Sequence, residues 1–299
     1  MKPAAWTIAG AAILDWTIGD PPGLPHPVRA IGAAIALADA RFNRDGAGSR
    51  FAGGLVALAV VLGAAAAGAL VARRRIGAVV AAASTLATHD LVREARAVHH
   101  ALQADSLADA RMAVARIVGR DTQDLDASEV ARATIETLAE SACDGIVAPL
   151  FWLALGGVPG AFAFKAASTL DSMIGHRTPR HERFGSVAAR LDDAANLVPA
   201  RLTALLIALA GARPIATIRA AMREAESHTS PNAGWPESAL ASALGLRLGG
   251  TNRYAGVAVG GPIFNPGGRA PHADDIPRAI AQVQRISLAA TLLAIRVRA

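Results

Sequence analysis

Three carboxylates lie four residues apart in one stretch of the chain. Glu136, Glu140 and Asp144 follow the spacing that places side chains on one face of a helix. Like charges at this spacing destabilise a bare helix, so we expect a cation against this face, either a divalent metal ion or lysine and arginine side chains. Arg132 extends the stripe by one turn and supplies one such partner. A solvated polar surface is the alternative.

A second polar group follows an uncharged run. Lys165 and Asp171 flank the small polar segment AAST, and His176, Arg177 and Arg180 come next. Cations beyond an apolar run can bind anionic lipid headgroups, and they can equally hold a phosphate. The residues by themselves leave both interpretations open.

A third group contains Asp192, Asp193 and Asn196. Asp192 and Asn196 lie one helical turn apart, and side-chain oxygens are the ligands that Mg²⁺ prefers. Pro199 and Arg201 then lead into the next apolar run. The pattern predicts that these side chains share a magnesium ion.

The composition indicates that the elements carrying these groups lie in a membrane. Of 299 residues, 53% are hydrophobic and 18% are charged, with a mean hydropathy of +0.34. An ordinary soluble domain is about 25% charged. The net charge of +6 comes from scattered arginines without an aromatic-plus-basic module, which argues against nucleic-acid binding. The single cysteine, Cys143, excludes an internal disulfide and a cysteine-based zinc site within one chain.

Residues 51–72 form the clearest transmembrane candidate, because the run is uncharged and long enough to cross a bilayer as a helix. Arginines flank it on both sides, so its orientation stays open. Residues 145–164 are also uncharged, but prolines and glycines break them. At membrane depth such a break requires cover from protein or a cavity. The runs at 202–212 and 286–295 are marginal in length.

The remaining segments complete an all-α prediction. We expect an apolar helix carrying Asp15 at residues 3–19 and a proline-rich linker at 19–32. Amphipathic helices, with apolar residues at three- and four-residue spacing, follow at 89–141, and a polar loop follows at 230–256. The sequence thus predicts a multi-pass helical integral membrane protein. Residues 1–299 would form a single membrane-embedded domain, with polar amphipathic helices and loops forming the site.

Five long motifs make the chain similar to one family. They occur in the order, and close to the spacing, of adenosylcobinamide-phosphate synthase, the CobD/CbiB family: GDPPGLPHPVRAIG, ETLAESACDGIVAPLFW, FKAASTLDSMIGHR, RLDDAANLVPARLTALL and SPNAGWPESALASALGLRLGG. The resemblance covers nearly the whole chain. Departures at Ser141, Ser168, His176–Arg177 and Thr251 bear on substrate preference more than on reaction class.

The resemblance implies a membrane enzyme of cobalamin biosynthesis. Family members join (R)-1-amino-2-propanol, or its O-phosphate, to a carboxylate of adenosylcobyric acid as an amide, with ATP and Mg²⁺. It also implies roles for the groups above. The expected catalytic residues are Glu136, Glu140, Asp144, Lys165 and Asp171; the ligand-binding residues are His176, Arg177, Arg201, Asn232, Trp235 and Glu237; the metal ligands are Asp192, Asp193 and Asn196.

Within these sets, Glu136 or Glu140 would take the proton of the amine, and Lys165 and the arginines would neutralise phosphate. Trp235, with Asn232 beside it, suits a corrinoid ring rimmed by amides.

The expected partners are the corrinoid, the amine, ATP and membrane lipid, with no nucleic acid. We expect the cell (inner) membrane as the location. A homo-oligomer and an association with other late cobalamin-pathway membrane enzymes both stay open. So do the choice between aminopropanol and its phosphate, and the number and orientation of spans. A transporter with buried carboxylates and a Mg²⁺-dependent membrane transferase of another class are the rival functions.

Overall fold

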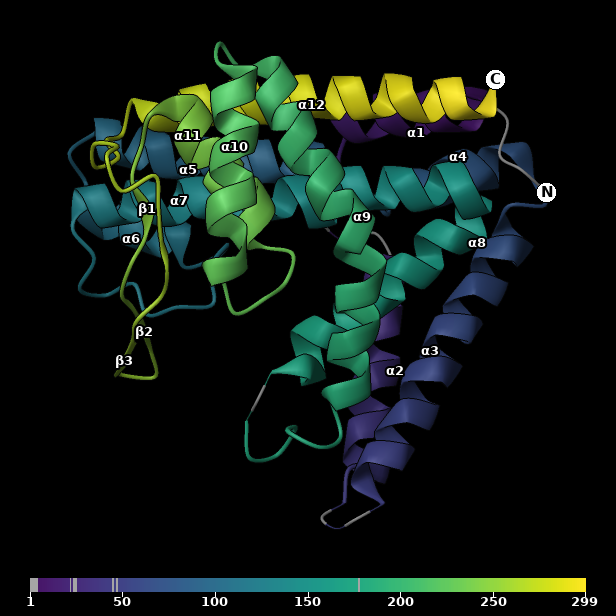
Figure 1. Ribbon diagram of the computed structural model, residues 1–299. Helices are drawn as coiled ribbons and strands as arrows, with labels where there is room; N and C mark the ends of the chain where they lie inside the picture. The colour runs from purple at the N-terminus through teal and green to yellow at the C-terminus, as the bar shows by residue number, and fades with distance from the viewer. Residues whose placement is uncertain (1–4, 22, 24–25, 45, 47, 177) are drawn as a thin grey trace. The chain divides into compact units, whose positions relative to one another are not determined.

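The computed structural model describes residues 5–21, 23, 26–44, 46, 48–176 and 178–299. Over these residues the regular structure is almost entirely helical, and the only strands are four very short ones (Figure 1). The α-helices are α1 (Ala5–Thr17), α2 (Pro27–Phe42), α3 (Ser49–Val71), α4 (Arg75–Ala83), α5 (Thr88–Gln103), α6 (Leu107–Val114), α7 (Ala127–Ala142), α8 (Ala148–Leu170), α9 (Ser186–Ala210), α10 (Pro214–Glu224), α11 (Gly234–Leu244) and α12 (Asp275–Arg298).

The predicted all-α, multi-pass membrane architecture is confirmed. Within the described ranges, four helical segments are long and apolar enough to cross a bilayer: Ser49–Val71, Ala127–Gly175, Ser186–Ala210 and Asp275–Arg298. The first matches the predicted span at 51–72. The expectation that 202–212 and 286–295 are marginal was wrong, because residues 202–210 and the run 286–295 belong to the longer helices α9 and α12, which are long and apolar enough to cross a bilayer.

The chain divides into two compact units, each assembled from separate segments. Unit 1 contains Met1–Ala87, Asp144–Leu197 and Ala290–Ala299, and unit 2 contains Thr88–Cys143 and Val198–Ala289. Two of the four boundaries fall inside α9 and α12, and the other two lie at the start of α5 and after Cys143. The grouping of residues 1–299 into one domain stays a prediction.

In unit 1, α3 packs along α8 and α2, and α1 packs on α4. Figure 1 shows α2 and α3 side by side. Ile35 of α2, Val56 of α3 and Leu170 of α8 meet in a buried apolar core together with Phe184. The prolines of 19–32 end where α2 begins, since Pro27 occupies the first helical turn, where a proline is tolerated.

Helix α8 is broken, as the sequence predicts. Gly157 has a φ of 70° and a ψ of −163°, which no α-helix contains, and Pro159 follows it. Such a φ is open to glycine at little cost. A π-helical turn, Cys143–Val147, precedes α8, and another, Asp171–Gly175, follows it. The apolar segment is therefore several short helical pieces.

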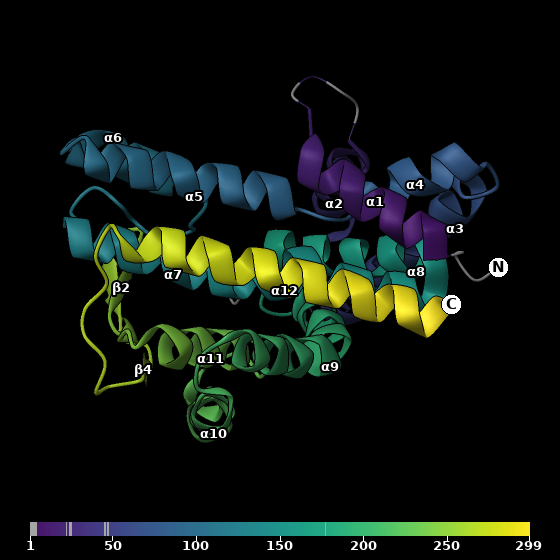
Figure 2. The same ribbon diagram turned by 90° about the horizontal axis from the view of Figure 1, so that it is seen from above.

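In unit 2, the amphipathic helices pack by their apolar faces. Helix α5 lies against α6 and α7, while α11 lies against α7 and α10, as Figure 2 shows for the α10–α11 pair. Helix α7 begins with a capping box: Asp126 accepts a hydrogen bond from the backbone of Glu129, whose side chain accepts one from the backbone of Asp126. This cap fixes where the carboxylate-bearing helix starts.

The structure corrects the prediction of a loop at 230–256. Residues Gly234–Leu244 form α11, because Pro236 lies in its first turn and alanines, leucines and serines fill the rest. Only the second half is extended. It contains the strands β1 (Leu248–Gly249) and β2 (Asn252–Tyr254), which pair antiparallel with β4 (Ile263–Phe264) and β3 (Val257–Val259) further along the chain.

Candidate functional site

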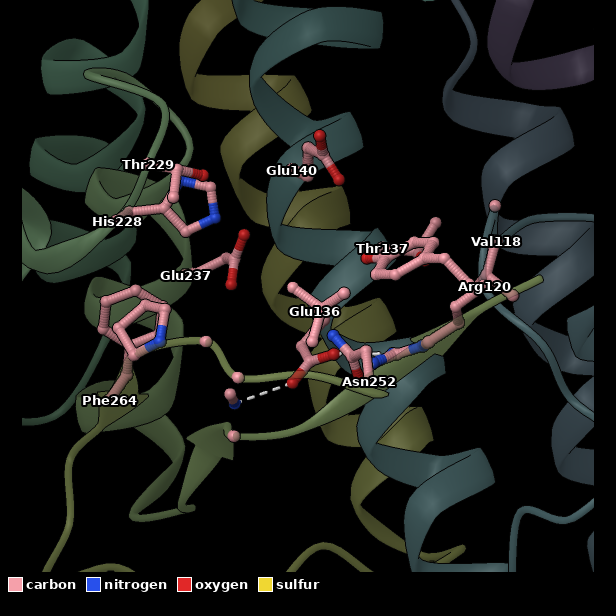
Figure 3. Close-up of a pocket in the computed structure, with 18 of the residues that line it drawn as sticks. Val118, Arg120, Glu136, Thr137, Glu140, His228, Thr229, Glu237, Asn252 and Phe264 are labelled. Atoms are coloured by element: carbon pink, nitrogen blue, oxygen red, sulfur yellow. Dashed lines mark hydrogen bonds and ion pairs between the residues drawn. The ribbon is translucent and has the colours of Figure 1, made fainter. Parts of the chain in front are cut away.

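A polar cavity of about 350 Å³ lies within unit 2 (Figure 3). Helices α7 and α11 line it, together with the segment before α11 and the glycine-rich strands β1 to β4. Its charged and polar lining includes Arg120, Glu136, Glu140, His228, Glu237 and Asn252. We call this cavity the α7–α11 pocket. It contains three of the carboxylates that the sequence singles out.

Glu136 is fully engaged by neighbouring groups. Its carboxylate lies 2.6 Å from Arg120 and 3.1 Å from Arg132, and it accepts a hydrogen bond of 2.7 Å from the backbone N–H of Gly249. Arg120 also donates to Asn252. The predicted arginine partner of Glu136 is thus confirmed. With a side chain only 11% exposed, Glu136 is a buried tie between α7 and β1.

The close approach of β1 depends on glycine. A Cβ at Gly249 would lie 1.9 Å from the carbonyl oxygen of Pro262, and the φ of Gly249 is +81°. Both the contact and the left-handed backbone exclude a larger residue. The N–H of Gly249 reaches Glu136 from this position, as the dashed line in Figure 3 shows.

Glu237 has the opposite environment. It is 9% exposed, on α11, and within the described part of the chain no hydrogen bond or ion pair engages its carboxyl group. Figure 3 shows this group and that of Glu140 both turned into the pocket. Burial raises the pKa of Glu237 well above its usual value, and the charges of Glu136 and Glu140 raise it further.

His228 is a functional candidate that the sequence interpretation missed. The backbone nitrogen of Ser230 lies 2.9 Å from its Nδ1, and its ring stacks on Phe264 with centroids 6.3 Å apart. The same nitrogen of the ring lies 3.3 Å from the carbonyl oxygen of Ser230, so whether Nδ1 accepts from the N–H or donates to the carbonyl depends on the tautomer of the ring. Burial lowers the pKa of His228, which favours the neutral form. No motif marks a lone histidine between a helix and a turn.

Arg201, Asn232 and Trp235 come together elsewhere in unit 2. The guanidinium of Arg201 lies over the Trp235 ring, 4.7 Å from its centroid, and its Nη1 is 3.5 Å from the side-chain oxygen of Asn232. Three of the residues predicted as ligand-binding therefore form one cluster. One face of the indole is already covered by a cation.

The other predicted residues belong to unit 1. Lys165 is half-buried and experiences the charges of Asp144 and Asp20. Asp171 experiences those of His176 and Asp193. Glu136 and Glu140 lie on α7, which ends at Ala142. Asp144 lies in the π-helical turn that begins at Cys143, so the α-helical spacing does not extend to it. Arg177 lies outside the described residues.

The predicted magnesium ligands are only partly assembled. Asn196 donates from Nδ2 to Asp192 at 3.1 Å, so the two side chains do meet. Across the described residues, no group of three or more His, Cys, Asp or Glu side chains is placed to hold a metal ion. The donors are nevertheless of the right kind, since Mg²⁺ is usually bound by one or two carboxylates together with substrate phosphates. The magnesium site stays a prediction.

The family model and three similar proteins found by comparison carry the names CobD or CbiB. The family model described as CobD/Cbib protein matches residues 8–283. A protein named Cobalamin biosynthesis protein CobD from Pelobacter propionicus is 43% identical over 288 residues, covering 90% of this chain and 89% of its own. Its namesake from Brucella anthropi is 44% identical over 301 residues, with the same coverage. Cobalamin biosynthesis protein CbiB from Salmonella choleraesuis is 41% identical over 292 residues, covering 92% and 91%. No solved structure matched.

Proposed function

The chain belongs to the CobD/CbiB family of cobalamin biosynthesis, and we propose that it catalyses the formation of an amide bond in that pathway. The acid would be adenosylcobyric acid, and the amine would be (R)-1-amino-2-propanol or its O-phosphate. ATP would activate the acid. A corrinoid substrate is consistent with the role of the family, and the amide chemistry is the part that we add.

The observation that carries this proposal is the buried carboxyl group of Glu237, which lines the α7–α11 pocket together with the exposed Glu140. An amine is protonated at neutral pH, and it becomes a nucleophile only after losing a proton to an acceptor. Carboxyl groups removed from bulk water can take up a proton at neutral pH, because burial raises their pKa. Amide formation needs such an acceptor.

The acid must also be activated, because a carboxylate does not react with an amine at neutral pH. We propose that ATP converts it to an acyl phosphate. Lys165 and Arg201 are the cations suited to compensate phosphate charge, and Asp192 and Asn196 supply oxygen donors suited to Mg²⁺. When bound, the ion would neutralise charge on the phosphate oxygens.

We further propose that the protein acts in the inner membrane of the cell. Its four candidate spans support a membrane location. Fractionation of inner and outer membranes tests this, with recovery in the inner-membrane fraction expected.

A direct assay tests the reaction. Purified protein in detergent is mixed with adenosylcobyric acid, ATP, Mg²⁺ and either amine, and the corrinoid product is identified by its mass. The expected product has gained one aminopropanol, or its phosphate, with loss of one water, and it forms only when ATP is present. Recovery of unchanged corrinoid with both amines would contradict the proposal. Formation of product without ATP would contradict the acyl phosphate.

A further inference from the structure

The pocket carries an inference about which substrate it binds. We propose that the α7–α11 pocket is the amine subsite, which holds the ammonium group of the small aminoalcohol between Glu237 and Glu140. The inference rests on the proposed amide-forming function, and it assigns one substrate to one described cavity.

The first argument is the state of Glu237. Its carboxyl group is buried, faces the cavity and is engaged by no described hydrogen bond or ion pair. Ionisation of a buried carboxyl group is unfavourable while no partner balances its charge. A cation entering the cavity would supply the missing partner.

The second argument is that Glu136 cannot play this part. Both of its oxygens already contact arginine side chains, and one also accepts the N–H of Gly249. The arginines compensate its charge, and the acidic character of the cavity comes from Glu140 and Glu237. The contacts of Glu136 thus distinguish it from Glu140 and Glu237, a difference that the sequence does not show.

The third argument is size. A cavity of about 350 Å³ is at the lower end of the range for small-molecule sites, roughly 300–1,000 Å³. A three-carbon aminoalcohol fits within it, whereas a corrinoid macrocycle does not. The ring of His228 also lines this cavity, and its nitrogens are of the kind that bind a hydroxyl or phosphate oxygen.

The reaction step that follows is balanced. The bound ammonium transfers one proton to the Glu237 carboxylate, which becomes neutral, and the nitrogen keeps the electron pair. That pair forms the C–N bond to the acyl carbon, while the C–O bond to phosphate breaks and phosphate leaves with its electrons. The second proton of the nitrogen passes to Glu140 or to the departing phosphate.

The pH dependence follows from the groups that face Glu237. These are Glu136, Glu140 and Arg132 from α7, Arg120 from the segment before it, and His228 from the segment before α11. Burial and the two glutamates raise the pKa of Glu237, and the arginines oppose the rise. Protonation of Glu237 removes the charge that binds the cation. Amine affinity should therefore fall as pH falls through this raised pKa, a range in which a primary amine stays protonated.

Calorimetric titration of the full-length protein in detergent tests the subsite. The probes are 1-amino-2-propanol and 1,2-propanediol, which lacks the amine. We expect the aminoalcohol to bind far more tightly than the diol, and Glu237→Gln to weaken its binding by about 10- to 100-fold, as for other charged hydrogen bonds. The matched control, Glu226→Gln, changes an exposed glutamate of unit 2 outside the pocket, and should bind as the wild type does.

Equal binding of amine and diol, or unchanged amine affinity in Glu237→Gln, would overturn the subsite. If this variant does not fold, the pH profile of the wild type decides, because an affinity that does not fall with pH also overturns it. The results of this titration can be distinguished from those of the reaction assay. Amine binding that depends on Glu237 supports the subsite even if no amide forms, and amide formation with unchanged binding rejects the subsite alone.

Discussion

Two carboxylates in different units, the partly buried Asp39 and the buried Glu237, differ in how their charge is balanced. In unit 1, Asp39 of α2 lies 2.7 Å from Arg180 and 3.2 Å from His181, and it accepts a hydrogen bond of 2.8 Å from Asn43. In unit 2, Glu237 has a more buried position and no such partners. The first acid has its charge compensated by the protein, and the second does not.

The pKa values follow this difference. Burial alone would raise the pKa of Asp39, but hydrogen bonds from Arg180 and Asn43 outweigh it and hold the pKa below its usual value of 3.8. For Glu237, burial and neighbouring carboxylates together raise the pKa. A carboxylate paired with cationic side chains thus holds two segments of the chain together. A buried carboxyl group without such partners ionises unfavourably, and a bound cation would compensate its charge. The comparison teaches that pairing, and not residue type, separates a structural carboxylate from a candidate site.

The largest expected effect is the loss of Glu136, the paired acid of unit 2. Glu136→Ala leaves Arg120 and Arg132 buried without their partner, so we expect the free energy of unfolding to fall by about 3–5 kcal/mol. Chemical denaturation in detergent measures this, with Glu226→Ala as the exposed control. A loss no greater than that of the control would mean that Glu136 does not tie α7 to β1, and the contrast with Glu237 would fail.

A pair of neighbouring glycines gives the next effect. Gly249 and Gly250 both have positive φ values, of +81° and +98°, but only a Cβ at Gly249 would meet another atom, the carbonyl oxygen of Pro262. Gly250→Ala should cost about 1 kcal/mol from backbone strain alone. Gly249→Ala should cost more and should also weaken amine binding, because it displaces the N–H that holds Glu136. Equal losses in thermal unfolding would contradict the proposed packing of β1.

Local patterns predicted much of this fold, and contacts between distant segments explain what they missed. The span at residues 51–72 follows from hydropathy, and the broken helix around Gly157 follows from its glycines and prolines. Helix α11 was missed because its prolines and glycines resemble a loop, although Pro236 lies where a helix tolerates it.

The site was less accessible to sequence reasoning. Glu136, Glu140 and Glu237 were all singled out, but their sequence spacing cannot show that Arg120 and Gly249 engage the first of them. His228 carries no pattern at all. Its environment is created by Phe264 and Ser230, which the fold brings to it.

The smallest effect concerns Asp39. Because its side chain is 15% exposed and Arg180 is 62% exposed, Asp39→Asn should cost no more than about 1 kcal/mol. A lowered folded-state pKa stabilises the protein above the unfolded value of 3.8, and this contribution is lost as pH falls through the folded pKa. The stabilities of the wild type and the variant should therefore converge as pH falls from 3.8 through the lower folded-state pKa. A difference that persists or grows there would contradict the pairing.

Steady-state kinetics of Glu237→Gln provide the most direct test of the central claim, that Glu237 serves the amine. Amide formation is measured while the aminoalcohol and ATP are varied in turn, with Glu226→Gln as the control. We predict that kcat/KM for the amine falls at least about 100-fold, the usual contribution of a proton acceptor, while the KM for ATP stays near the wild-type value. Wild-type kcat/KM for the amine, or an equal loss towards both substrates, would contradict the account.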